Sequence, residues 1–271
     1  QRLRDIRTML DEYGLSPLHK LGQNFLHDHN IIGKLVDASG VQEGELVVEV
    51  GPGTGALTEA LLERGCSVIA CELDKGLTGL LQDKFGNTIT LIHGDCLQKK
   101  KLNPEIIEAI DGRTWKLVSN LPYQIASPLM VGILAEHQTC LGQYVTIQYE
   151  VAQRLMASVN SSDWGVLSIL VQRLADVELI TKVPNTCFWP QPKITSACVG
   201  VVPKPVQPVN SVEFALFVTA LFAKRRKQIG TIIGRDVALP EGVTEDMRPA
   251  TLTIQQLEEI YTTVKTSEGQ I

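Results

Sequence analysis

Residues 46–55, which read LVVEVGPGTG, decide the fold of this 271-residue chain. The first five are apolar apart from one glutamate, a pattern that is typical of a strand buried on both faces. The last five place a glycine at every second position, residues 56–64 then repeat leucine and alanine at helical spacing, and residues 66–71 form a second apolar run. This order predicts strand, glycine loop, helix and parallel strand, the repeating unit of an α/β fold.

The glycine loop predicts a ligand that carries a ribose. Glycines let the main chain approach a ligand closely, and Glu72, at the end of the second strand, can accept hydrogen bonds from both ribose hydroxyls of an adenosyl group. The spacing is G-x-G-x-G rather than the G-x-G-x-x-G of dinucleotide sites, which favours S-adenosylmethionine over a pyrophosphate ligand. A nicotinamide-dependent oxidoreductase is the alternative that this spacing disfavours.

Two further predicted strands also end in polar side chains. Asp95 follows the apolar run 88–93, and Asn120 follows the run 115–119. In an open α/β sheet the ligand binds outside the carboxyl ends of the strands. We therefore expect Gly51, Glu72, Asp95 and Asn120 to line one crevice.

Residues 120–123, Asn-Leu-Pro-Tyr, predict a grip for an exocyclic amine. The Asn120 side chain and the Leu121 carbonyl can each accept a hydrogen bond from such an amine. Pro122 fixes the local backbone and keeps the segment out of a strand ladder, while Tyr123 offers a face on which a base can stack. Adenine N6 fits this grip when the base is unpaired or flipped, because the amine is inaccessible inside a helix. A turn that merely closes a strand is the alternative.

Several motifs are spread along the chain in a fixed order: KLGQNFL at 20–26, EVGPGTG at 49–55, ELD at 72–74, GD at 94–95, NLPY at 120–123 with SPL at 127–129, QYEVAQRL at 148–155, FWPQPKI at 188–194 and KRRK at 224–227. On these motifs the chain resembles the small-subunit ribosomal RNA adenine N6,N6-dimethyltransferase family over nearly its whole length. The resemblance implies a Rossmann-like class I S-adenosylmethionine-dependent methyltransferase domain, α/β in class, followed by a small helical C-terminal domain.

The resemblance also assigns roles to residues. The cofactor-binding set would be Gln23, Asn24, Leu26, Glu49, Gly51, Gly53, Glu72, Asp95 and Asn120. Within it, Glu72 would bind the ribose, Asp95 the adenine amine, and Asn120 would lie between cofactor and target. The catalytic set would be Asn120, Leu121, Pro122, Tyr123 and Phe188. Phe188 would be a second aromatic opposite Tyr123, with a buried core phenylalanine as the alternative.

The charge of the chain is unusual for a protein that binds RNA. It has 25 Lys and Arg against 30 Asp and Glu, a formal net charge of −5. The cluster Lys224, Arg225, Arg226 and Lys227 resembles the basic RNA-binding patch of the family, although cations at a helix end can also oppose the helix dipole. Lysines 99–101 and the arginines near the amino terminus are further candidates for phosphate contacts. Because the chain as a whole carries no net positive charge to attract RNA, we expect modest affinity for naked RNA and greater dependence on an assembled particle.

Length and composition predict two domains, at 1–202 and 203–271, with the boundary near Val202, where prolines interrupt the pattern. The six cysteines form no C-x-x-C pair and His27 and His29 have no third partner, so we expect neither a disulfide scaffold nor a metal site. With no apolar run long enough to span a membrane and no secretory leader, we expect a cytoplasmic protein. We also expect a monomer.

These features predict an rRNA adenine N6,N6-dimethyltransferase that uses S-adenosylmethionine. By the resemblance, it would act on adjacent adenines near the 3′ end of small-subunit rRNA during ribosome assembly, with the small ribosomal subunit as its partner. One alternative is a large-subunit adenine N6-methyltransferase of the macrolide-resistance type, which Gly22 and the basic C-terminal motif disfavour. Another is a non-catalytic nucleic-acid-binding factor on the same fold, which the intact site motifs disfavour.

Overall fold

The computed structural model describes residues 2–18, 22–205 and 211–268, so Lys20 and Leu21 of the first motif lie outside the described residues. Contacts between residues divide the chain into two compact units, one of Gln1–Ala152 with Asp176–Pro203 and the other of Gln153–Ala175 with Lys204–Ile271. One break lies between Pro203 and Lys204, close to the predicted boundary near Val202, but residues 153–175 also group with the C-terminal segment. Their apolar side chains, such as Trp164 and Ile169, are buried in the core of the second unit.

The first unit is built on a seven-stranded sheet in the order β4-β3-β2-β7-β8-β11-β9. Its strands are β2 (Leu46–Val50), β3 (Ser67–Glu72), β4 (Thr90–His93), β7 (Trp115–Asn120), β8 (Cys140–Gln148), β9 (Ala175–Val183) and β11 (Ser196–Pro203). The strands β4, β3, β2, β7 and β8 run parallel, and β11 joins β8 in the antiparallel sense. The predicted α/β class with a mostly parallel sheet is confirmed.

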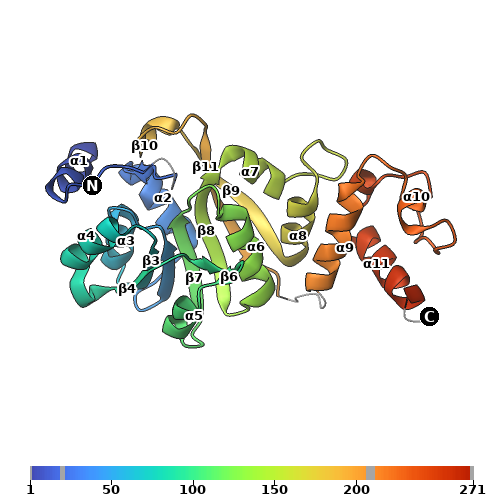
Figure 1. Cartoon of the computed structure of the whole chain (residues 1–271), viewed down its shortest axis with the longest axis horizontal. Coiled ribbons are helices and arrows are strands. Elements are labelled where there is room, and N and C mark those ends of the chain that lie inside the picture. The colour runs from blue at the N-terminus through green and yellow to red at the C-terminus, as the bar shows by residue number, and fades with distance from the viewer. Residues whose placement is uncertain (1, 19–21, 206–210, 269–271) are drawn as a thin grey trace. The chain divides into compact units, whose positions relative to one another are not determined.

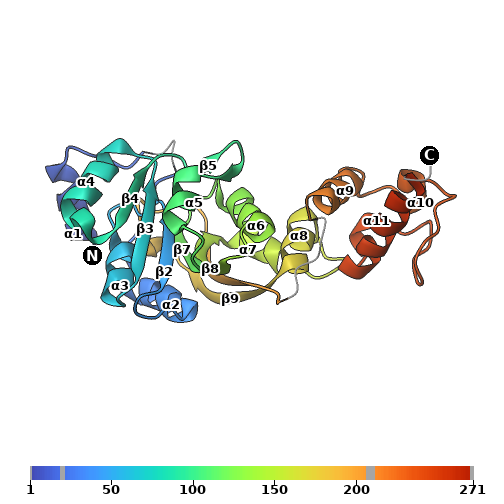
Figure 2. The ribbon, with the colours of Figure 1, turned by 90° about the horizontal axis from the view of Figure 1, so that it is seen from below.

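Helices cover both faces of the sheet (Figure 1). They are α2 (His29–Ser39), α3 (Ala56–Glu63), α4 (Lys75–Phe85), α5 (Pro104–Ile110), α6 (Ala126–Glu136) and α7 (Tyr149–Leu155). Figure 2 shows α2 and α3 on one face and α5 and α6 on the other. All five residues of β2 are buried, as a strand covered on both faces requires.

The strand order reverses between β2 and β7, and these two strands separate toward their carboxyl ends. Their ladder runs only from Leu46↔Trp115 to Val48↔Leu117. Beyond it, the Val50 amide donates instead to the Ser119 hydroxyl at 2.8 Å. A reversal of this kind is where α/β sheets bind their ligands.

Short elements surround this edge of the sheet. Helix α1 (Leu3–Glu12) packs through Ile6 and Leu10 against Phe25 and Leu77. Strand β1 (Phe25–Leu26) pairs with β10 (Phe188–Trp189), and β5 (Leu97–Gln98) forms a hairpin with β6 (Lys101–Leu102). Two single turns, η2 (Gly86–Thr88) and η3 (Asn185–Cys187), complete the unit.

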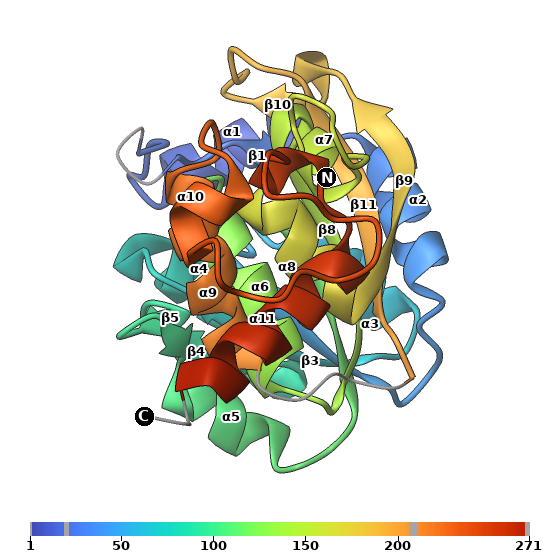
Figure 3. The ribbon, with the colours of Figure 1, turned by 90° about the vertical axis from the view of Figure 1, so that its right-hand side faces the viewer.

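The second unit is helical. It contains α8 (Val166–Leu174), α9 (Ser211–Ala223), α10 (Ile229–Ile233), η4 (Pro249–Thr251) and α11 (Ile254–Glu268). Helix α9 packs against both α8 and α11 (Figure 3). The nearly buried Arg173 of α8 ties them together, because its guanidinium pairs with Glu258 of α11 at 2.7 Å and lies 4.2 Å from the ring centroid of Phe214 in α9. No helix within the described ranges has the length and apolar character that a membrane span requires.

Candidate active site

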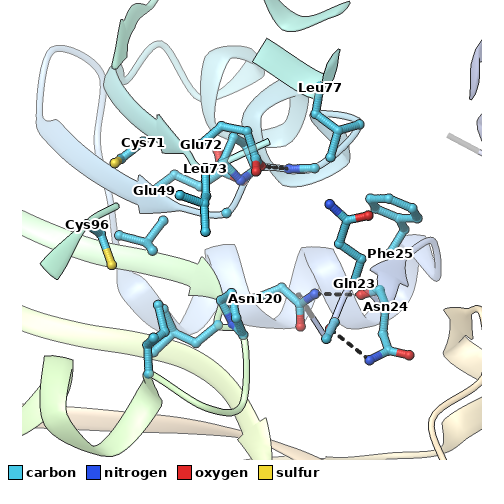
Figure 4. A pocket seen from close by; sticks show the side chains of 18 of the residues that line it. Gln23, Asn24, Phe25, Glu49, Cys71, Glu72, Leu73, Leu77, Cys96 and Asn120 are labelled. Atoms are coloured by element: carbon cyan, nitrogen blue, oxygen red, sulfur yellow. Dashed lines mark hydrogen bonds between the residues drawn. The ribbon is translucent and has the colours of Figure 1, made fainter. Parts of the chain in front are cut away.

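A cavity of about 240 Å³ lies at the carboxyl ends of β2, β3, β4 and β7. Figure 4 shows that its walls come from segments far apart in the sequence. Of the predicted site residues, those that line it are Gln23, Asn24, Leu26, Glu49, Gly51, Gly53, Glu72, Asp95, Asn120, Leu121, Pro122 and Tyr123. The crevice expected from four strand ends is therefore present, and Phe188 alone of the predicted cofactor and catalytic residues does not line it.

The loop between β2 and α3 needs glycine for two separate reasons. Gly51, Gly53 and Gly55 all have positive φ, between 61° and 79°, which L-residues with a side chain rarely adopt. A Cβ atom added at Gly53 would also lie 2.8 Å from the Phe25 ring, closer than atoms pack. The main chain of this loop therefore lines one wall of the cavity, with no side chain at its glycines to cover it.

Glu72, the last residue of β3, is hydrogen-bonded to this loop. The residue is 5 % exposed, and its carboxylate accepts hydrogen bonds from the Gly53 amide at 3.2 Å and the Asp74 amide at 2.9 Å. Burial raises the pKa of Glu72, and the two amide donors oppose that rise. Asp95, at the end of β4, is exposed and accepts from the Leu97 amide at 2.9 Å.

Asn120 is held by the segment that carries the first motif. Its Nδ2 donates to the main-chain carbonyl of Asn24 at 3.0 Å, and the Asn24 side chain donates in turn to the Gly22 carbonyl at 3.0 Å (Figure 4). This bond uses the donor end of the Asn120 amide and leaves Oδ1 as an acceptor. The Leu121 amide donates to Thr146 at 3.1 Å, whereas the Leu121 carbonyl accepts no hydrogen bond from the described residues. Two oxygen acceptors thus stand on consecutive residues of the cavity wall.

The Tyr123 ring is anchored from behind. Its hydroxyl lies 2.8 Å from the hydroxyl of Ser196, which is fully buried at the start of β11. Burial raises the pKa of Tyr123, so the phenol stays neutral at physiological pH. The hydrogen bond fixes the plane of the ring at the edge of the cavity.

We predict that Ser196→Ala raises KM for the RNA substrate expected from the sequence about fivefold, because one neutral hydrogen bond contributes about 1 kcal/mol. Affinity for S-adenosylmethionine should stay unchanged. Tyr123→Phe keeps the ring, loses the same bond and should have a similar effect. Steady-state kinetics of the single and double variants check this, since the double variant should be no worse than either single. Additive losses would show that Ser196 and Tyr123 act separately.

Phe188, which was predicted as an aromatic that flanks the target, does not line the cavity in this structure. Successive side chains of a strand point to opposite sides, and the pairing of Phe188 with Leu26 turns its ring into the core, where it is 1 % exposed. The neighbouring Trp189 points the other way. It stacks on Phe25 with centroids 6.4 Å apart, and Arg7 lies 5.2 Å from its ring centroid.

Glu49 is a buried acid on the cavity wall. It is 1 % exposed, accepts a hydrogen bond from Thr58 at 2.6 Å, and burial raises its pKa to about 8. It is therefore largely protonated at neutral pH. Glu49 was predicted as a cofactor contact, and its position on the wall is compatible with that role.

We predict a pH dependence of stability from this group. An acid whose pKa is raised by folding stabilises the folded state fully below its unfolded pKa of about 4.5, and this contribution is lost as pH rises toward 8. The parent chain should therefore lose stability as pH rises, and Glu49→Gln should not. In that window the free energy of unfolding of the parent, measured against that of Glu49→Gln, should fall by up to about 1.4 kcal/mol per pH unit. Denaturant titrations at pH 5, 6, 7 and 8 measure it. If the difference in free energy of unfolding between the two chains does not change with pH, folding does not raise the pKa of Glu49.

Sequence reasoning missed several apolar residues of the cavity. Leu73 and Cys96 directly follow the predicted acids Glu72 and Asp95, and Leu77 comes from the first turn of α4. Leu73 is 49 % exposed despite being apolar, so it offers a surface that a ligand can cover. Their position next to strand-end acids is the signal that would have identified them.

The predicted RNA-binding residues lie in the second unit. Lys224, Arg225, Arg226 and Lys227 follow the end of α9 at Ala223, and all four are exposed. Within the described residues none of the four forms an ion pair. Arg225 donates to the Trp164 carbonyl at 3.4 Å. The four cations are therefore available to a polyanion.

The lining of the cavity fits S-adenosylmethionine. The three carboxyl groups of Glu49, Glu72 and Asp95 line it, and the described lining includes no lysine or arginine. Glu49 is mostly uncharged, but Glu72, Asp95 and the lack of a cationic side chain in the described lining suit a ligand with a sulfonium and an ammonium group and oppose a pyrophosphate. The glycine loop supplies main-chain groups, and Glu72 at the end of β3 supplies an acceptor for the ribose. The exposed Leu73 supplies an apolar face. This fold and this site define a class I S-adenosylmethionine-dependent methyltransferase.

Comparisons with known proteins identify the family. The family model described as ribosomal RNA adenine dimethylase matches residues 17–266, and the chain belongs to that family. Among relatives, a ribosomal RNA small subunit methyltransferase A from Geobacillus sp. (strain WCH70) is 40 % identical over 230 residues, which are 82 % of this chain and 78 % of the relative. The protein of the same name from Alkaliphilus oremlandii is 34 % identical over 267 residues, 92 % of each chain.

Solved structures agree on the fold. A dimethyladenosine transferase from Plasmodium falciparum has a TM-score of 0.73 at 21 % identity, covering 91 % of this chain and 98 % of that one. The 23S rRNA methyltransferase ErmE has a TM-score of 0.66 at 22 % identity, covering 89 % and 100 %. At these identities the likeness concerns the fold alone.

Proposed function

We propose that this chain transfers methyl groups from S-adenosylmethionine to N6 of two adjacent adenines near the 3′ end of small-subunit rRNA during ribosome assembly. The observation that carries the proposal is the pair of acceptors at Asn120 and Leu121, with the Asn120 amide oriented by the Asn24 carbonyl. The family description and the names of the relatives, which specify a dimethylase and the small subunit, support it.

The cofactor half of the cavity would hold its ligand through this chain's own groups. S-adenosylmethionine supplies an electrophilic methyl group on a sulfonium. Glu72 accepts hydrogen bonds from the ribose hydroxyls, Asp95 accepts from the adenine amine, and the loop at Gly51 and Gly53 leaves room for the methionine part. Because the electrophile is already activated, the protein contributes mainly position and orientation.

The target half would prepare the nucleophile. Asn120 Oδ1 and the Leu121 carbonyl each accept one hydrogen of the adenine amine, which draws the nitrogen lone pair out of conjugation with the ring. These hydrogen bonds strengthen as positive charge develops on the nitrogen, so they favour the transition state over the ground state. Tyr123 holds the base by stacking. The departing proton passes to water, so no histidine, cysteine or lysine is required as a base.

Other functions on this fold are less well supported. A large-subunit adenine methyltransferase shares the fold, as the likeness to ErmE illustrates, but relatives at 34–40 % identity carry the small-subunit name. A non-catalytic nucleic-acid factor has no need of an acidic cofactor cavity or of oriented acceptors. We further propose that the enzyme acts as a monomer, since one chain supplies the whole cavity, and in the cytoplasm, where bacterial small subunits assemble.

We also propose that residues 224–227 bind rRNA phosphates, and we predict the consequence of reversing their charge. Arg225→Glu with Arg226→Glu should weaken binding to small subunits and lower the slope of log affinity against log salt by about 1 to 2, because two phosphate contacts are lost. Binding measured between 50 and 300 mM salt checks this. Equal slopes would assign the four cations a purely local role.

The proposed function is tested by incubating the enzyme with small subunits that lack the modification and with methyl-labelled S-adenosylmethionine. We expect label on two adjacent adenines near the 3′ end of the rRNA, located by digestion and mass spectrometry. Large subunits serve as the matched control and should remain unlabelled. Label on the large subunit alone, or on neither particle, would reject the proposal.

A further inference from the structure

The hairpin of β5 and β6 carries two lysines in an unusual conformation. Its register pairs Leu97 with Leu102 and Gln98 with Lys101, which leaves a loop of only two residues, Lys99 and Lys100. Both have positive φ, at 51° and 68°. Positive φ at both central positions is the signature of a type I′ turn.

Lysine is a poor choice for this turn on structural grounds. Type I′ turns strongly prefer Asn-Gly or Gly-Gly, because a Cβ atom disfavours the left-handed region at both central positions. The chain uses glycine wherever its cofactor loop needs positive φ, yet here it keeps Lys99 and Lys100. Local strain that a simple substitution would relieve points to a function of the side chains.

The two lysines are free to meet a partner. Both are exposed, and within the described part of the chain neither forms an ion pair or a side-chain hydrogen bond. The next residue, Lys101, differs, because it pairs with Glu136 at the end of α6 at 3.3 Å. The tip of the hairpin therefore presents two uncompensated positive charges to solvent.

The base of the hairpin is fixed to the wall of the cavity. Asp95 and Cys96 line the cavity, and β5 begins at the next residue. Asn103, which is 1 % exposed, donates from its main chain to the Cys96 carbonyl at 2.8 Å and from its side chain to the Asp95 carbonyl at 2.9 Å. Lys99 is three positions beyond Cys96 in the chain, so the tip lies within about 10 Å of the cavity wall.

We propose that Lys99 and Lys100 form a phosphate clamp that holds the RNA backbone beside the target adenine. This inference rests on the proposed function, since it takes the substrate to be RNA. The strained turn aims two cations outward on a short arm whose base is hydrogen-bonded to the site. Contacts to phosphate position a nucleic acid without reading its sequence, which suits a clamp on nucleotides that flank the methylated base. The clamp lies in the first unit and is separate in the chain from residues 224–227.

The decisive variant is Lys99→Asn with Lys100→Gly, which installs the preferred turn and removes both charges. We expect its melting temperature to equal or exceed that of the parent and its affinity for S-adenosylmethionine to be unchanged. Affinity for small subunits at 150 mM salt should fall about tenfold, and the salt slope should fall by about 1.4, as for two contacts to single-stranded RNA. Lys99→Gln with Lys100→Gln keeps a Cβ atom at both positions of positive φ but removes the charges, and it should lose as much affinity as the variant with Lys99→Asn and Lys100→Gly. Lys99→Arg with Lys100→Arg should retain binding.

A matched control removes two positive charges elsewhere on the same unit. Arg64 and Arg113 are exposed and precede β3 and β7, at the amino ends of the strands and so at the opposite edge of the sheet from the cavity. Arg64→Gln with Arg113→Gln should leave the salt slope within experimental error of the parent. The clamp is overturned if the parent binds and methylates small subunits while both neutral hairpin variants keep its affinity and slope. Failure of the parent itself to methylate would instead reject the proposed function.

Discussion

Asn120→Ala should reduce methyl transfer by about 100-fold or more, while the dissociation constant of S-adenosylmethionine changes little. In the proposed mechanism the side chain accepts a hydrogen from the amine as positive charge develops there, and loss of one such contact at a reacting centre costs on the order of 10²- to 10³-fold. The residues proposed to bind the cofactor, the glycine loop with Glu72 and Asp95, are unchanged in this variant. Single-turnover kinetics with saturating small subunits, together with calorimetric titration of the cofactor, separate the two effects.

Gln124→Ala is the matched control for Asn120→Ala. Gln124 also carries an amide and lines the same cavity, but it is exposed and its side chain forms no hydrogen bond with the described residues. Its turnover should stay within about threefold of the parent, as surface substitutions usually do. Near-normal turnover of Asn120→Ala would remove the acceptor pair from the mechanism.

Glu72→Ala should weaken S-adenosylmethionine binding by about 100-fold or more. A carboxylate that accepts two ribose hydroxyls makes two charge-assisted hydrogen bonds, each worth about 1.5–3 kcal/mol. The alanine variant also removes the acceptor of the Gly53 amide and so loosens the loop. Glu72→Gln preserves the size of the side chain and should lose about tenfold, because one acceptor oxygen remains.

Isothermal titration of S-adenosylmethionine and of methionine alone distinguishes a ribose contact from general damage to the loop. Methionine lacks the ribose, so its weak binding should be the same in Glu72→Gln and in the parent. Glu59→Gln, a change of the same chemistry at a partly exposed residue of α3 that pairs with Lys84, serves as the control and should bind the cofactor normally. Parent-like cofactor affinity in Glu72→Gln would show that Glu72 does not bind the ribose.

The architecture of the cofactor unit could be predicted because its signals are local. An apolar run, a glycine loop and a helical repeat between residues 46 and 64 determine one strand, one turn and one helix, and the structure has β2 and α3 there. The acids at the ends of β3 and β4 follow directly from where the apolar runs stop. Parallel strands then bring these ends together, so Gly51, Glu72, Asp95 and Asn120 could be placed in one crevice from the strand pattern, whereas Gln23, Asn24 and Leu26 were named through the family resemblance.

The parts that could not be predicted depend on contacts between distant residues. The pairing of the two-residue strand β10 with β1 decides whether Phe188 or Trp189 faces the core. The local sequence does not predict this pairing. Residues 153–175 begin within the motif QYEVAQRL at 148–155, and no change in composition marks the point where the second unit begins. They group with the second unit because α8 packs against α9, a helix that begins at Ser211. The orientation of the Asn120 amide likewise requires the Asn24 carbonyl.

A crystal structure of the enzyme with S-adenosylhomocysteine and a short RNA that contains the target adenines tests the acceptor pair most directly. We expect the adenine amine within about 3.2 Å of both Asn120 Oδ1 and the Leu121 carbonyl oxygen, with the base stacked on Tyr123 and the ribose of the cofactor bound to Glu72. An adenine held elsewhere, or an amine that contacts neither oxygen while the cofactor is bound, would contradict the mechanism.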